Sequence, residues 1–152
     1  MVKKMNKKID EIDKKIVNTL LFNADTTNRE LASKFKIALG TVNNRLKKLR
    51  KLGVIKKKTI VVNYEKLGYA IQVLIGVRIK KGGFYEIANK LISHPNVFTI
   101  MDMTGIYDAE ILARFNTTRQ LDNFIKKLQK DEDVVYTRTK LILNIYREKE
   151  IK

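Results

Sequence analysis

The chain has 152 residues, enough for one ordinary domain or two small ones, and 44% of them are hydrophobic, which suffices for a packed core. It has no cysteine and one histidine, which argues against disulfides, a thiolate metal site, a cysteine nucleophile and a histidine-rich metal centre. Since no long apolar run and no secretory signal is visible, we expect a cytoplasmic protein that needs neither a metal nor a cofactor.

The net charge of +16 is unevenly distributed along the chain. Residues 1–60 hold 17 Lys and Arg against 5 Asp and Glu, whereas residues 61–152 hold 15 against 11. This asymmetry predicts a polyanionic partner for the N-terminal part. Double-stranded DNA is the favoured partner, because an anionic membrane would select one long basic amphipathic helix with exposed aromatic residues.

The N-terminal part shows the pattern of a helix-turn-helix. A first helix is expected at residues 10–21 with Asp10 as its N-cap, and residues 27–30 fit a capping box that begins a second helix. Residues 36–38 form a connection of the length expected before the second helix of such a unit. That helix, at residues 39–52, has one apolar stripe made of Val42, Leu46, Leu49 and Leu52.

Residues 54–62 predict a wing after these helices, with Lys56–Lys58 as a basic turn between short strands at Val54-Ile55 and Thr59–Val62. A solvated hairpin without a DNA contact is the alternative. Long cations reach phosphates, and Asn can pair with adenine in the major groove. The candidate phosphate contacts are Arg29, Lys34, Arg45, Lys47, Lys48, Lys56, Lys57 and Lys58, and the candidate base contacts are Gly40, Thr41, Asn43 and Asn44.

From Ala70 onward the pattern changes to alternating strands and amphipathic helices. The expected order is strand, helix, strand, strand, helix, strand, at residues 71–79, 84–92, 97–103, 109–115, 117–128 and 137–147. The fold class is therefore α+β, with an N-terminal winged helix-turn-helix and a C-terminal ferredoxin-like βαββαβ domain. The expected domains are residues 1–62 and 70–152, joined by a hinge at residues 63–69.

The two faces of the predicted sheet differ. The face expected to be covered by helices carries Ile71, Val73, Ile75, Val77, Ile111, Ala113, Phe115, Leu141 and Leu143. The opposite face is half apolar because it includes Leu74, Leu112 and Ile142 among polar residues. Such a face favours packing against a second copy, so we expect a homodimer.

Six segments in register resemble the leucine-responsive/asparagine-type (Lrp/AsnC, feast/famine) transcriptional regulators of bacteria and archaea. The resemblance covers nearly the whole chain. It rests on residues 9–16, 41–49, 52–55, 63–68, 105–108 and 137–139. Three positions depart from the family pattern: Lys36 and Ala38 replace the usual Gly and Ser before the recognition helix, and Tyr64 replaces a frequent Pro in the hinge.

The resemblance implies a dimer that often assembles into tetramers or octamers, with an amino acid or related metabolite bound between dimers. The effector-site candidates that it implies are Asp102, Thr104, Gly105, Tyr107 and Asp108. A glycine turn could offer backbone N–H groups to a carboxylate, and an acidic side chain could hold an ammonium group. The alternative is that Gly105 only permits the turn and Asp108 only caps it.

The favoured function is therefore a sequence-specific DNA-binding regulator, with the basal transcription machinery as a further candidate partner. A nucleoid-type architectural protein of low specificity is the first alternative. An enzyme similar to the sirohaem decarboxylases, which resemble this family's fold, is a remote one. It would need basic and histidine residues around a tetrapyrrole, and the only histidine is His94, where we expect a helix-end cap. We therefore expect a protein that is not an enzyme.

Overall fold

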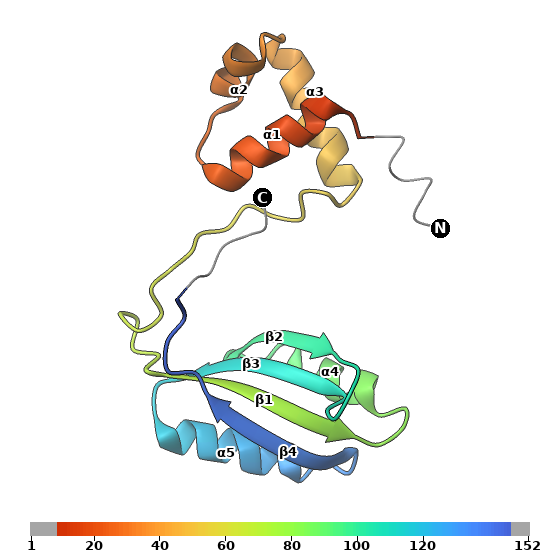
Figure 1. Ribbon diagram of the computed structural model, residues 1–152, viewed down its shortest axis with the longest axis vertical. Helices are drawn as coiled ribbons and strands as arrows, with labels where there is room; N and C mark the ends of the chain where they lie inside the picture. Colours follow the sequence, from red (N-terminus) through yellow and green to blue (C-terminus); the bar gives the residue numbers. More distant parts are fainter. Residues whose placement is uncertain (1–8, 147–152) are drawn as a thin grey trace. The chain divides into compact units, whose positions relative to one another are not determined.

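The computed structural model describes residues 9–146 and divides into two compact units, one up to Val61 and one from Val62 onward. The N-terminal unit contains helices α1 (Glu11–Phe22), α2 (Asn28–Phe35) and α3 (Leu39–Lys51). The C-terminal unit contains β1 (Ile71–Ile79), α4 (Phe84–Leu91), β2 (Val97–Asp102), β3 (Ala109–Phe115), α5 (Thr118–Gln129) and β4 (Val134–Leu141) (Figure 1). No helix within residues 9–146 is both long and apolar enough to cross a membrane.

Local sequence signals set the starts of the first two helices. Asp10 caps α1: its carboxylate accepts a hydrogen bond from the Asp13 backbone N–H, and the Asp13 carboxylate accepts one from the Asp10 N–H. Thr27 and Glu30 form the same reciprocal box at the start of α2. The predicted caps are therefore confirmed at both helices. By contrast, Ala38 precedes α3 and makes no side-chain cap.

The turn between α2 and α3 contains a backbone conformation that lysine rarely adopts. Lys36 has φ +51° and ψ +47°, the left-handed region, and it is the only non-glycine residue with positive φ among the described residues. The Lys36 N–H and the Ile37 N–H both close the end of α2 by donating to its last carbonyl groups. This geometry favours glycine, which is the residue that the resemblance leads us to expect at this position.

Replacing Lys36 with Gly is expected to raise the free energy of unfolding of the N-terminal unit by about 0.5–1 kcal/mol, because the left-handed penalty disappears. Urea unfolding followed by far-UV circular dichroism measures this gain. Ser33→Gly, inside α2, is the matched control and should instead destabilise by about 0.5 kcal/mol. A loss of stability in Lys36→Gly would show that the backbone at residue 36 is not strained.

The wing expected after α3 does not form strands. Both the Val54 N–H and the Ile55 N–H donate to the Leu49 carbonyl, so these amides close the end of α3 and cannot join a strand pair. Residues 56–63 contain no strand, and Ile60 and Val61 are strongly exposed. The cause is that a strand needs a partner ladder, and the chain that precedes the segment is already used by the helix end.

In the C-terminal unit, the sheet is fully antiparallel with strand order β2-β3-β1-β4. Helices α4 and α5 cover one face, and the core lies between them and the sheet (Figure 1). Its fully buried members include Val73, Ile75, Val77, Ile111 and Phe115, as the alternation predicted. This is the expected βαββαβ arrangement.

The last strand differs from the prediction. β4 covers Val134–Leu141 rather than residues 137–147, and residues 142–146 are not in a strand. Leu141 pairs with Val73 on the helix-facing side, yet it is 59% exposed, and Leu143 is 81% exposed. Since β4 is an edge strand, its end lies beyond the part of the sheet that the core covers. The apolar pattern alone could not show this.

The expected hinge is folded onto the C-terminal unit. Lys66 donates its N–H to Asn63, and Asn116 donates its side-chain N–H to the Gly68 carbonyl. The Tyr64 ring lies 3.8 Å from the Arg114 guanidinium and packs edge to face against Phe98. Tyr64, where the resemblance leads us to expect Pro, therefore anchors this segment through its ring.

Candidate nucleic-acid interface and ligand site

Helix α3 is positioned by a small core shared by all three N-terminal helices. Val42, Leu46 and Leu49 of α3 are buried against Ile16 of α1 and Leu31 of α2. Helical spacing places the opposite side of α3 toward solvent. The exposed residues on that side are Gly40, Thr41, Asn44, Lys47 and Lys51, which we call the reading face.

The flank of α3 that faces α2 holds Asn43. Its side-chain carbonyl accepts a 2.7 Å hydrogen bond from the Asn28 side chain, and the residue is half-buried. Asn43 was a candidate for base contact, but this bond ties its oxygen to α2. Asn44, one residue on, is exposed and takes the leading place for base readout.

The flank of α3 that faces α1 holds Arg45 and Lys48 in ion pairs. Arg45 Nη1 lies 2.6 Å from Asp10 and 2.8 Å from Asp13, and Lys48 Nζ bonds to the other oxygen of Asp13. Asp13 is fully buried. Arg45 and Lys48 were predicted to contact phosphate, and in the structure both are paired with carboxylates inside the unit, so a phosphate would have to compete with Asp10 and Asp13 for them.

These pairs shift the pKa values of the carboxyl groups. For Asp13, burial opposes ionisation, but hydrogen bonds from Lys48 and Arg45 outweigh it and hold the pKa below its usual value. The hydrogen bond from Arg45 is the largest cause that lowers the pKa of Asp10. Both groups are therefore ionised at neutral pH, and the network consists of two anions and two cations.

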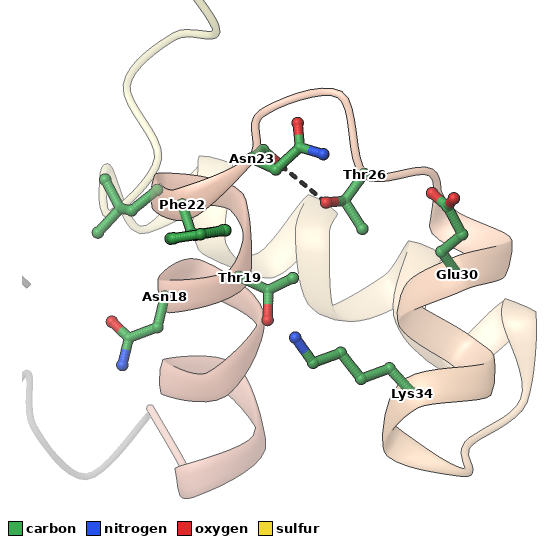
Figure 2. Close-up of a pocket in the computed structure, with 8 residues that line it drawn as sticks. Asn18, Thr19, Phe22, Asn23, Thr26, Glu30 and Lys34 are labelled. Atoms are coloured by element: carbon green, nitrogen blue, oxygen red, sulfur yellow. Dashed lines mark hydrogen bonds between the residues drawn. The ribbon is translucent and has the colours of Figure 1, made fainter.

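Lys34 lies on the side of α2 that faces α1. It lines a shallow hollow of about 610 Å³ between these helices, together with Asn18, Thr19, Leu21, Phe22, Asn23, Thr26 and Glu30. Figure 2 shows its amine pointing toward Thr19. Arg29 is exposed on another side of α2. Of the two candidate cations on α2, Arg29 is therefore the better placed for phosphate.

Lys56, Lys57 and Lys58 are exposed in an extended segment. Lys58 lies 3.1 Å from Asp25, but both side chains are largely in solvent, so this pair holds the segment only weakly. The three lysines thus remain candidates for backbone contact without the hairpin that was expected to present them.

In the C-terminal unit, the turn after β2 is closed by backbone and side-chain bonds. Met103 N–H donates to the Asp108 carbonyl, and Gly105 has φ +116°. The Asp108 carboxylate accepts a hydrogen bond of 2.7 Å from the Ile79 N–H and one of 3.3 Å from the Arg78 side chain. Asp108 therefore caps the end of β1, and this structural use limits its expected role in holding an ammonium group.

Tyr107 lies flat on the open face of the sheet. Its ring sits over Gly76, where an added Cβ would lie 2.8 Å from a ring carbon, and it stacks on Tyr136 at 6.0 Å between centroids. A hydrogen bond with Tyr136, followed by the influence of Arg138, lowers the pKa of Tyr107. The Lys140 amine lies 5.6 Å from the same ring. Asp102 and Thr104 are exposed beside this turn.

The structure places several residues at these sites that were not among the predicted site residues. Lys51 shares the reading face because it follows Asn44 and Lys47 at helical spacing, a signal that the sequence contained. Arg78 donates to the Gly105 and Ile106 carbonyls, at 3.3 and 3.2 Å. Tyr136, Arg138 and Lys140 come to Tyr107 through the pairing of β4 with β1, which only the register reveals.

His94 has a structural environment. Its Nδ1 accepts a hydrogen bond from the Asn96 N–H, and its ring packs edge to face on Phe124 at 4.9 Å. Burial, and next the charge of Lys127, lower its pKa. Within residues 9–146, no group of three His, Asp or Glu side chains could hold a metal ion.

Comparison with known proteins agrees with this architecture. Residues 9–56 match the family model for winged helix-turn-helix DNA-binding domains, and residues 72–151 match that of the Lrp/AsnC ligand-binding domain. The HTH-type transcriptional regulator FL11 of Pyrococcus furiosus is 36% identical over 140 residues, which cover 92% of this chain and 93% of that protein.

Two AsnC proteins are also similar. The regulatory protein AsnC of Haemophilus influenzae is 31% identical over 133 residues, covering 86% of this chain and 89% of that one. The structure of E. coli AsnC superimposes with a TM-score of 0.84 at 28% identity, over 94% of this chain and 97% of the other. Together these define a DNA-binding transcriptional regulator whose C-terminal domain binds a ligand. The chain belongs to the Lrp/AsnC family of transcriptional regulators.

Proposed function

We propose that the protein reads a specific operator sequence with the reading face of α3. The observation that carries this proposal is the exposure of Asn44 between the cations Lys47 and Lys51 and the small residues Gly40 and Thr41. Asn offers a donor and an acceptor to adenine, and small residues let the helix backbone approach the base edges. Arg29 and Lys56–Lys58 would add phosphate contacts that position the helix.

The second part of the proposal is assembly through the open sheet face. Leu74, Leu112 and Ile142 are half-buried there in the single chain, beside the Lys140–Glu110 ion pair. A second copy packed on this face would present two recognition helices, as operators with two half-sites require. Tetramers or octamers built from such dimers belong to the same proposal, and the cytoplasm, where the DNA lies, is the expected compartment.

The third part is an amino acid or related metabolite as the effector, bound near residues 102–108. Within the described residues, the backbone N–H groups of residues 104–107 donate no hydrogen bond to the protein, so they are available to a carboxylate. Arg78 and Arg138 add positive charge beside them. The ligand-binding family model over this domain supports a small-molecule site.

Asn44→Ala and Lys47→Ala separate base readout from phosphate contact. We expect Asn44→Ala to lose about 1–3 kcal/mol on a selected genomic fragment and little on random DNA. Lys47→Ala should weaken binding to both duplexes and reduce the log–log salt slope by about one unit. Binding titrations of both duplexes at several salt concentrations measure these effects. Equal losses for Asn44→Ala on both duplexes, or uniform binding by the unmodified protein, would favour the architectural alternative.

A further inference from the structure

The ion-pair network between α1 and α3 divides the cations of the recognition helix into two groups. Lys47, Arg50 and Lys51 are exposed, and no ion pair is found for them among the described residues. Arg45 and Lys48 are instead held by Asp10 and Asp13. We call these four residues the clamp.

Within the clamp, the two carboxylates bind the two cations much as phosphate oxygens would. Asp13 uses one oxygen for Arg45 and the other for Lys48, and Asp10 adds a second acceptor to the same Arg45 nitrogen. Guanidinium and ammonium groups make the same charge-assisted contacts with phosphate oxygens. The two carboxylates therefore compete with DNA phosphates for Arg45 Nη1 and for the Lys48 ammonium group.

The two paired cations lie close to the reading face of α3. Lys48 follows Thr41 by seven residues and Asn44 by four, so it borders the reading face, and its side chain is still 37% exposed. Arg45 is more enclosed, with 20% of its side chain exposed. Both cations are on flexible stems that could turn to a phosphate if the carboxylates were neutralised.

We propose that Asp10 and Asp13 are specificity-determining residues, because they fix the orientation of α3 and withhold two of its cations from DNA phosphates. The inference rests on the proposed sequence-specific function. Contacts with phosphate strengthen binding to every sequence, whereas base readout requires the helix at a defined orientation. A carboxylate pair that restrains cations and holds the helix therefore raises discrimination between sequences, even though it lowers total affinity.

Asp10→Asn tests this with little risk to folding, because the Asp10 side chain is 52% exposed. Glu11→Gln is the matched control: it removes the same charge one residue away, from an exposed pair with Lys14 that does not involve α3. Each variant is titrated in a salt series against two duplexes of equal length. One is the genomic fragment that the unmodified protein binds most tightly, and the other has a random sequence.

We expect Asp10→Asn to bind the random duplex about fivefold more tightly near 0.1 M salt, with a log–log slope steeper by up to about 0.9. Its ratio of affinities for the two duplexes should fall by about threefold relative to Glu11→Gln, since the selected complex also loses orientation. Asp13→Asn should exceed these changes, provided that circular dichroism shows it folded.

Equal slopes and ratios for Asp10→Asn and Glu11→Gln would overturn the inference and leave the clamp a purely structural one. If Asp10→Asn lost stability but kept the log–log salt slope of DNA binding, the inference would be overturned as well. If instead the unmodified protein does not discriminate between the duplexes, the proposed function itself fails, which is a separate and recognisable result.

Discussion

Replacing Asp13 with Ala is expected to destabilise the N-terminal unit by about 3 kcal/mol, because it leaves Arg45 and Lys48 without the buried carboxylate that neutralises both. Asp13 is fully buried, and Arg45 Nε is already enclosed without a partner among the described residues, so little water is at hand to replace the bond that Arg45 loses. This is among the largest effects that we expect from any polar substitution in the chain.

The distribution of chromophores lets this effect be assigned to one unit. The chain has no Trp, and its six Tyr residues all follow residue 63. Tyrosine fluorescence therefore reports the C-terminal unit, whereas circular dichroism at the helix band also reports α1–α3. In urea unfolding, Asp13→Ala should lower the midpoint of the N-terminal transition, which is seen by circular dichroism. The transition seen by tyrosine fluorescence should keep its midpoint. Glu11→Ala, the exposed control, should change stability by less than about 0.5 kcal/mol.

The same network predicts the pH dependence of the N-terminal unit. The pKa values of Asp10 and Asp13 are lower in the folded protein than their usual values. Their contribution to stability is therefore fully present above the unfolded pKa of about 4 and is lost as pH falls through the lower folded values. Asp13→Ala should lack most of this acid loss, and an unchanged acid transition in the variant would contradict the assignment.

Replacing Gly76 with Ala is expected to destabilise the C-terminal unit by about 1–3 kcal/mol through overpacking. The added Cβ would lie 2.8–2.9 Å from three carbons of the Tyr107 ring, closer than carbon atoms tolerate. The ring must leave its place on the sheet, and with it the stacking on Tyr136. Tyrosine fluorescence during urea unfolding measures the loss.

Tyr107→Ala provides the control for this substitution. In the double variant the added Cβ meets no ring, so Gly76→Ala should cost much less in the Tyr107→Ala background than in the unmodified protein. Equal costs in both backgrounds would show that the strain arises elsewhere in β1. Ligand binding by Gly76→Ala, once an effector is found, should fall with the displacement of Tyr107.

Local sequence signals were enough to predict the helix starts and the first strand. The N-cap at Asp10 and the capping box at Thr27 predicted the helix starts correctly because each depends on neighbouring residues, and the strict alternation over nine residues was long enough to predict β1. The wing and the end of β4 could not be predicted, because a strand depends on whether a distant segment offers a ladder. Lys56–Lys58 and Leu143 therefore have surroundings that composition did not reveal.

The candidate site was harder to predict than the fold for a related reason. Arg45, Lys47 and Lys48 look equivalent in the sequence, yet only Lys47 faces solvent freely. Their difference arises from two carboxylates more than 30 residues earlier, which helix packing brings to α3. The charges on α3 made all three candidates for phosphate contact, but charge could not separate the cations that pair with carboxylates inside the unit from the one that is exposed.

The uncapped start of α3 has a consequence for the dynamics of the recognition helix. Ala38 supplies no side-chain acceptor, whereas Asp10 and Thr27 do so for α1 and α2. The first turn of α3 therefore opens locally more readily than the starts of its neighbours. Within the described residues, the N–H groups of residues 39–41 donate no hydrogen bond to the protein, and such groups at a helix start suit a phosphate oxygen. If DNA ordered this turn on binding, the entropy lost in ordering it would reduce the binding affinity.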